Sequence, residues 1–206
     1  MKSTGCFFYG IVIEMNQTIK NIVLTGFRAT GKSTVGRLLA QELRYTFIDT
    51  DTLLCARLGA PIADIVARHG WAFFRQAERS LLMEVPEMER TVLATGGGAI
   101  EHEEQWHRIR KGCYVVWLDA DVATIRLRMG DDPQSAGQRP ALTGRSAHDE
   151  IEELLQRRAP LYAAGSDLRL DTVGQEPSAL VASIVEQMRS VLQGAGGSCG
   201  VVKSNG

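Results

Sequence analysis

Residues 26–33 read Gly26-Phe-Arg-Ala-Thr-Gly31-Lys32-Ser33 and match the phosphate-binding pattern G-x-x-x-x-G-K-S/T at every fixed position. A hydrophobic strand is predicted just before them, over 21–25, and a helix from Lys32 to Leu43. Glycines let backbone N–H groups turn towards phosphate oxygens, and the helix start adds the positive end of its dipole. The stretch therefore predicts a site for a nucleoside triphosphate. A glycine-rich turn without a ligand is the alternative, and the strand and helix in register argue against it.

Short apolar runs alternate with amphipathic stretches on both sides of this loop, which indicates βα units around a parallel sheet. Further strands are predicted over 45–48, 91–94, 114–118 and 168–170. Further helices are predicted over 62–68, 71–85, 102–110, 122–128, 149–157 and 178–192. The expected fold class is α/β, a three-layer sandwich with a central five-stranded parallel sheet.

The composition indicates a single globular domain and argues against several classes of binding partner. The chain has 206 residues, 44% hydrophobic and 23% charged, which suits one globular domain over about 20–193. We expect a poorly ordered extension over 1–19 and a disordered Gly/Ser-rich tail over 194–206.

A net charge of −1 provides no general attraction for nucleic acid or an anionic membrane, and no apolar run is long enough to span a bilayer. The four cysteines lie far apart, which argues against a disulfide framework or zinc site and favours the cytoplasm.

Two carboxylates follow the second predicted strand, in Asp49-Thr50-Asp51. Ligands of open α/β folds bind at this carboxyl edge of the sheet. Carboxylate and hydroxyl oxygens suit Mg²⁺, so Asp49 and Ser33 are candidate ligands. Acids that simply cap the next helix are the alternative.

Arg75 and Glu78 lie three residues apart in the predicted helix 71–85 and so share one face. A guanidinium offers a planar fork that suits a carboxylate, and a neighbouring glutamate can fix its direction. An ordinary exposed ion pair is the alternative at this spacing. Only the surrounding motifs favour a binding role.

Three glycines, Gly96-Gly97-Gly98, follow the predicted strand 91–94 directly. They leave the backbone open to a ligand, whereas the alternative is a plain turn.

The helical pattern stops over about 129–145, and Arg139 lies in this polar stretch. A long polar loop is more often functional than idle, and an arginine there can stabilise charge on a phosphoryl group or simply be solvated.

The last motif is Arg158-Ala-Pro-Leu-Tyr162, which matches the pattern R-x-P-L-Y. With this motif and those above, in the same order over about 21–192, the chain resembles the shikimate kinase family. The resemblance implies a P-loop kinase fold with a mobile lid over about 129–145. It also implies transfer of the γ-phosphoryl group of ATP to shikimate, which yields shikimate 3-phosphate and ADP in chorismate and aromatic amino-acid biosynthesis.

The resemblance also implies roles for individual residues. It places ATP against Gly26, Ala29, Thr30, Gly31, Lys32, Ser33, Thr34, Arg128, Arg139 and Gln175. It places shikimate against Asp51, Arg75, Glu78, Gly96, Gly97, Gly98 and Arg158, with Arg75 and Arg158 on the carboxylate. It implies catalysis by Lys32, Asp51 and Arg139, and Mg²⁺ held by Ser33 and Asp49.

Three other interpretations are weaker. Another small-molecule kinase of this branch, such as a gluconate kinase, would not need two arginines for a carboxylate. A guanine-specific switch would carry an N-K-x-D motif, which is absent. A non-catalytic P-loop binding module would be expected to have lost site residues that are intact here. The expected partners are therefore ATP and shikimate, with no nucleic acid and no membrane, and the chain is expected to act as a monomer.

Overall fold

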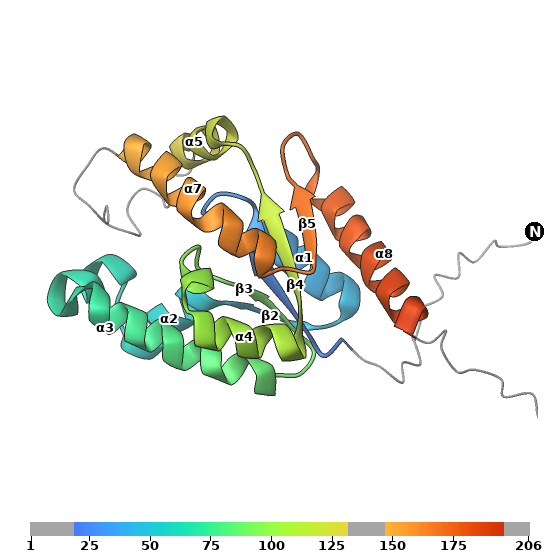
Figure 1. Cartoon of the computed structure of the whole chain (residues 1–206). Helices are drawn as coiled ribbons and strands as arrows, with labels where there is room; N and C mark the ends of the chain where they lie inside the picture. The colour runs from blue at the N-terminus through green and yellow to red at the C-terminus, as the bar shows by residue number, and fades with distance from the viewer. Residues whose placement is uncertain (1–18, 132–146, 196–206) are drawn as a thin grey trace, which may run out of the picture.

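The structure is a computed structural model that describes residues 19–131 and 147–195. Its centre is a parallel sheet of five strands in the order β2-β3-β1-β4-β5. The strands are β1 (Asn21–Thr25), β2 (Thr46–Asp49), β3 (Thr91–Ala94), β4 (Cys113–Asp119) and β5 (Leu168–Asp171). The three central strands are almost wholly buried, as expected for a parallel sheet covered on both faces. The predicted fold class is confirmed (Figure 1).

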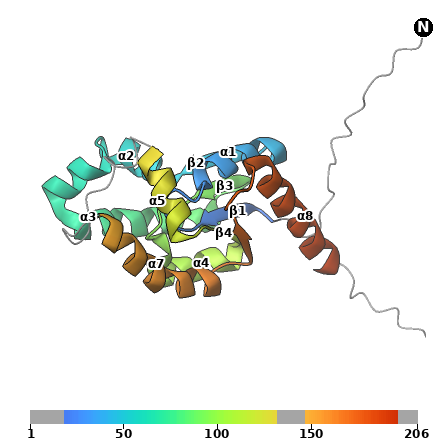
Figure 2. The same ribbon diagram turned by 90° about the horizontal axis from the view of Figure 1, so that it is seen from above.

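The helices are α1 (Lys32–Leu43), α2 (Thr50–Leu58), α3 (Ile62–Glu84), α4 (Glu103–Gly112), α5 (Val122–Asp131), α7 (Ala147–Ala164) and α8 (Pro177–Ala195). Two short 3₁₀ turns, η1 (Val85–Glu87) and η2 (Ala99–Glu101), complete the described elements. Because the side chains of a strand alternate, Ile22 and Leu24 pack with α1 and α8, whereas Val23 packs with α3, α4 and α7. The sheet thus lies between two helical layers (Figure 2).

The strand predictions and the first helix agree closely with the structure, but two helical details differ. Helix α2 was not predicted, because it is short and its apolar residues show little helical periodicity. The two helices predicted over 62–68 and 71–85 are confirmed, because Gly70, with φ of 79° and ψ of 167°, breaks the helical backbone inside the span labelled α3. Helix α7 continues through Pro160 to Ala164 instead of ending near Arg157. The cost of a proline inside a helix is one lost backbone hydrogen bond, which the packing of α7 tolerates here.

The topology determines where a site can form. The strands β2, β3 and β1 are neighbours and all parallel. The segments that follow them therefore leave the same carboxyl edge of the sheet side by side. These segments carry Asp49, the triple glycine and the phosphate loop, so motifs that are far apart in the sequence meet at one edge.

Candidate active site

The phosphate loop connects β1 to α1 in a strained, tightly packed turn. Gly26, Ala29 and Gly31 all have positive φ, of 134°, 60° and 88°. A Cβ at Gly26 would collide with the carbonyl oxygen of Leu118 on β4, so only glycine fits there. The buried hydroxyl of Thr30 donates to the Phe27 carbonyl at 2.8 Å and stabilises the turn from within.

Lys32 and Ser33 open α1 directly after this turn, with Thr34 exposed beside them. The Lys32 ammonium bends back over the loop and donates to the Phe27 carbonyl at 2.5 Å. A cation above a ring of inward-turning N–H groups forms an anion site at the positive end of a helix dipole. The loop therefore has the form that binds a triphosphate.

Asp49 ends β2 and makes contacts with both of its carboxylate oxygens. Oδ2 accepts a hydrogen bond from the Ser33 hydroxyl at 2.7 Å. Oδ1 accepts from the backbone N–H groups of Asp51 and Thr52, both at 3.1 Å, and so caps α2. Asp49 therefore caps α2, as the alternative interpretation held, and it is also the residue that was predicted to bind Mg²⁺.

A hydroxyl and a carboxylate 2.7 Å apart fit Mg²⁺, which binds one or two protein oxygens and completes its shell with phosphate oxygens and water. Among the described residues there is no cluster of three or more His, Cys, Asp or Glu side chains that would hold a metal by itself. The donor set therefore suits a metal that arrives with a nucleotide.

The Asp49-Thr50-Asp51 motif is joined to the triple glycine. Thr50 is buried, and its hydroxyl accepts from the Gly96 N–H at 2.9 Å. Asp51 lies in the first turn of α2, so Asp49 and Asp51 do not share one extended segment. The motif still lies at the edge where the phosphate loop begins.

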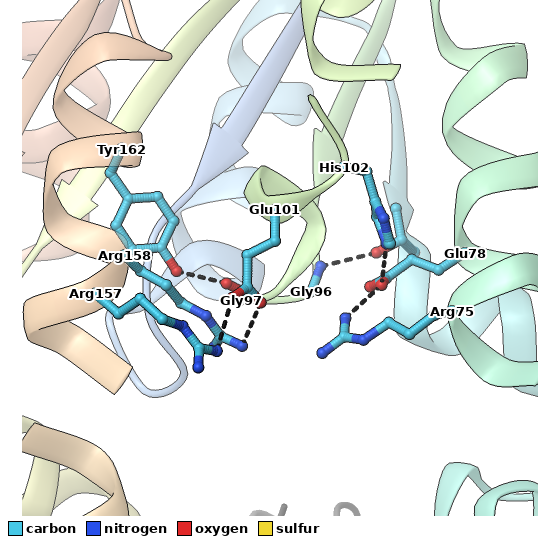
Figure 3. Close-up of polar contacts among 10 residues, drawn as sticks. Arg75, Glu78, Gly96, Gly97, Glu101, His102, Arg157, Arg158 and Tyr162 are labelled. Atoms are coloured by element: carbon cyan, nitrogen blue, oxygen red, sulfur yellow. Dashed lines mark hydrogen bonds and ion pairs between the residues drawn. The ribbon is translucent and has the colours of Figure 1, made fainter. Parts of the chain in front are cut away.

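Arg75 lies on α3 and pairs with Glu78 one turn later. Nη1 of Arg75 donates to Oε2 of Glu78 at 2.5 Å, and the glutamate side chain is fully buried. The same oxygen is 2.8 Å from Nε2 of the buried His102 (Figure 3). This is not the exposed surface pair that was the alternative, because the Glu78 carboxylate is buried and has His102 as a second partner.

Arg158 approaches from α7. Its side chain is only 5% exposed, whereas that of Arg157 is 55% exposed, so the structure distinguishes the two adjacent arginines. Each donates to a different oxygen of Glu101 at 2.7 Å. Burial alone would raise the pKa of Glu101, but the hydrogen bonds and charges of Arg158 and Arg157 together lower it below its usual value. Glu101 is therefore a carboxylate between two guanidinium groups.

The triple glycine separates the two arginines. A Cβ on Gly98 would overlap the Arg75 guanidinium, so that guanidinium lies against the loop. On the Arg158 side, Tyr162 donates to the Gly97 carbonyl at 2.6 Å. Arg75 and Arg158 thus reach the Gly96–Gly98 loop from opposite flanks (Figure 3).

Two further residues expected to contact ATP, Arg128 and Gln175, lie near the segment that follows β5. Arg128 donates to the Ala29 carbonyl at 3.3 Å and to the Thr172 hydroxyl and carbonyl at 2.9 and 2.7 Å. Gln175 is exposed on the same β5–α8 connection. Arg139, most of the predicted lid, the extension over 1–18 and the tail over 196–206 lie outside the described residues.

Four contact residues were not singled out from the sequence: Thr50, Glu101, His102 and Tyr162. Tyr162 and Thr50 lie inside motifs that were recognised, and their positions in those motifs were the available signal. Glu101 and His102 follow the triple glycine after Ala99 and Ile100, but nothing in their type or spacing distinguishes them from surface residues. They were found only through Arg158 and Glu78, which they contact.

Comparison with known proteins agrees with this arrangement. The family model for shikimate kinase matches residues 28–189. The chain is 43% identical to the shikimate kinase of Moorella thermoacetica over 84% of its own length and 96% of the relative's. It is 39% identical to the shikimate kinase of Nitratidesulfovibrio vulgaris over 86% of its own length and 98% of the relative's.

A solved structure gives the same result. The shikimate kinase of Acinetobacter baumannii in complex with shikimate superposes with a TM-score of 0.78 at 31% identity, over 84% of this chain and 95% of that one. The family match covers residues 28–33 of the phosphate loop and both Arg–Glu pairs, Arg75–Glu78 and Arg158–Glu101. The chain therefore belongs to the shikimate kinase family.

Proposed function

We propose that the residues around the phosphate loop carry out the reaction of this family, the ATP-dependent phosphorylation of shikimate to shikimate 3-phosphate and ADP. The observation that carries the proposal is the placement of two arginines, Arg75 and Arg158, on opposite flanks of the Gly96–Gly98 loop beside the phosphate loop. A gluconate kinase or a nucleotide-binding module has no use for this pair.

We assign recognition of the acid group to these two guanidiniums. Each uses one terminal nitrogen for its own glutamate, so other N–H groups stay available for a ligand. Nε of Arg158 is buried and has no hydrogen-bond partner among the described residues. A carboxylate between the arginines would accept hydrogen bonds from their remaining terminal N–H groups, and a neutral polyol would leave charge unpaired.

Asp51 and Gly97 are assigned to the hydroxyl side of the acceptor. In the transfer, the acceptor oxygen forms a bond to the γ-phosphorus while the bond from phosphorus to ADP breaks, and Asp51 accepts the hydroxyl proton. Lys32 neutralises charge that spreads over the phosphoryl oxygens. The same role is assigned to Arg139 on its sequence context alone.

The nucleotide is assigned to the phosphate loop, with Arg128 and Gln175 on the adenine side. Ser33 and Asp49 would hold Mg²⁺, which when bound supplies charge neutralisation at the β- and γ-phosphates. Gly26, Ala29, Thr30, Gly31 and Thr34 shape the loop that presents N–H groups to the same phosphates.

All of these residues come from one chain, which supports the proposal that a monomer is active. None of the described helices has the length and apolarity that a membrane span needs. In the described part of the chain, Cys113 is a buried free thiol, which supports the further proposal of a reducing, cytoplasmic location.

A coupled ADP-release assay tests the function. Shikimate, quinate, gluconate and nucleoside monophosphates are compared as acceptors at saturating ATP and Mg²⁺. We expect saturable ADP release with shikimate and a much lower kcat/KM with each alternative. Equal turnover of gluconate or of a nucleoside monophosphate would contradict the assignment.

A further inference from the structure

Two consecutive residues join the two sides of the proposed carboxylate site. Glu101 is the last residue of η2 and His102 follows it as the N-cap of α4. Glu101 reaches Arg158, whereas His102 turns the other way and reaches Glu78 (Figure 3). A continuous path of contacts therefore runs from Arg158 through Glu101 and His102 to Glu78 and Arg75.

We propose that Glu101 and His102 are positioning residues that set the direction and separation of the two arginines. The proposal rests on the function proposed above and adds to it how the binding geometry is maintained. Neither residue needs to touch the substrate, because each acts through an arginine that does.

His102 acts on the Arg75 side. Its Nε2 and the Arg75 Nη1 meet at the same oxygen of Glu78, at 2.8 and 2.5 Å. Two donors on one carboxylate oxygen fix the rotation of that carboxylate and so the direction in which Arg75 extends. His102 and Glu78 are both buried, so water competes little with this contact.

Glu101 acts on the Arg158 side. Both of its oxygens are used, one by Arg158 and one by the more exposed Arg157. Two guanidiniums and one carboxylate leave one net positive charge, which matches one carboxylate of a ligand. Arg157 thus compensates the charge of Glu101, so that Glu101 orients Arg158 without neutralising the site.

The backbone between the two residues is also fixed. The His102 N–H donates to the Ala99 carbonyl at 3.1 Å, and the His102 carbonyl accepts from the Trp106 N–H at 2.8 Å. Glu101 and His102 therefore cannot move independently of η2 and α4. A change in one arginine's position cannot be absorbed by a shift of this segment.

The His102 side is tested with two variants. His102→Phe keeps the volume of a ring but removes the donor, whereas the amide of His102→Gln places a donor near the position of Nε2. We expect His102→Phe to raise the KM for shikimate roughly tenfold, with the KM for ATP changed less than about twofold, and His102→Gln to restore most of the loss. The matched control is His107→Phe, an exposed histidine on the same helix.

A double-mutant cycle separates positioning from general support of the fold. In an Arg75→Lys background, His102→Phe is expected to have a much smaller effect on the KM for shikimate, because the residue through which it acts has changed. Equal effects in both backgrounds would show that His102 only supports the core.

The Glu101 side is tested with Glu101→Ala, and with Glu104→Ala on the exposed face of α4 as control. We expect the KM for shikimate to rise roughly tenfold in the first and to stay unchanged in the second. A lower KM in Glu101→Ala would overturn the proposal, because it would mean that Glu101 competes with substrate for Arg158.

Shikimate turnover by the unaltered chain is measured in the same assay. Its absence would refute the proposed function, whereas normal turnover with unaltered KM values in both variants would refute only the positioning role.

Discussion

Individual side chains in this site have more than one structural role, as Asp49 shows. One of its oxygens caps α2 and the other accepts from Ser33. Sequence reasoning set these two roles against each other, but a carboxylate has enough lone pairs for both. A substitution that preserves the cap can therefore isolate the role in metal binding.

Asp49→Asn is such a substitution, because asparagine caps helices about as well as aspartate. It removes the negative charge that favours Mg²⁺. We expect the Mg²⁺ concentration for half-maximal activity to rise roughly tenfold, with little change in the thermal unfolding temperature. A Mg²⁺ titration of the coupled assay measures this, and an unchanged requirement would remove Asp49 from the metal site.

Lys32 and Asp51 are predicted to act on the chemical step. Lys32→Ala and Asp51→Asn should each lower kcat by about 10²- to 10⁴-fold, because they remove charge stabilisation and proton acceptance respectively. Single-turnover measurements at saturating shikimate isolate this step. A variant that changes only the KM for shikimate would show that its residue binds substrate without taking part in the transfer.

At the scale of the element, the loop between β3 and η2 needs glycine for space. Gly98 has an ordinary φ of −96°, so the constraint at this position is not conformational. A Cβ there would meet the Arg75 guanidinium, the end of a flexible side chain that can move aside. The loop therefore allows the arginine to lie where the proposal needs it.

Gly98→Ala should accordingly fold but bind shikimate poorly. We expect the KM for shikimate to rise roughly tenfold and the unfolding temperature to change by about a few degrees at most. Gly112→Ala is the control, since a Cβ at Gly112 meets Pro86 at an ordinary 3.7 Å. Equal behaviour of the two variants would mean that the Arg75 position does not matter for binding.

Element types followed from sequence where the local signal was strong. The phosphate-loop pattern, the apolar runs of β1 and β3 and the period of α1 gave these elements their observed bounds. Helix α2 was missed because it is short and its apolar residues show little helical periodicity. The end of α7 was placed too early because Pro160 normally stops a helix, whereas here burial of Arg158 and Tyr162 on one face favours its continuation.

At the scale of the whole molecule, the Glu101 contacts also link stability to pH. Its pKa lies below the value of the unfolded chain, so its ionised form stabilises the fold above that value and the contribution is lost as pH falls through the lowered pKa. We expect wild type to unfold at a higher temperature than Glu101→Gln at pH 7, with a smaller difference near pH 3. A difference that does not change with pH would contradict this.

Contacts between side chains that lie far apart in the chain could not be predicted from the sequence. Parallel order brings the ends of β2, β3 and β1 together, and this much follows from the fold class. That Glu101 contacts Arg158, or that His102 completes the Glu78 pair, depends on how α3, α4 and α7 pack. No spacing in the chain encodes such contacts. The arginines proposed to bind substrate could therefore be named from sequence motifs, whereas Glu101 and His102 could not.

The two-arginine carboxylate site is tested most directly by the KM for shikimate in Arg75→Ala, Arg158→Ala and Arg157→Ala. We predict a rise of at least about tenfold in the first two, with the KM for ATP nearly unchanged, and a smaller rise of about threefold in Arg157→Ala, because the exposed guanidinium offsets the charge of Glu101 through solvent. Unchanged affinity in Arg75→Ala and Arg158→Ala, or a larger loss in Arg157→Ala than in Arg158→Ala, would contradict the account.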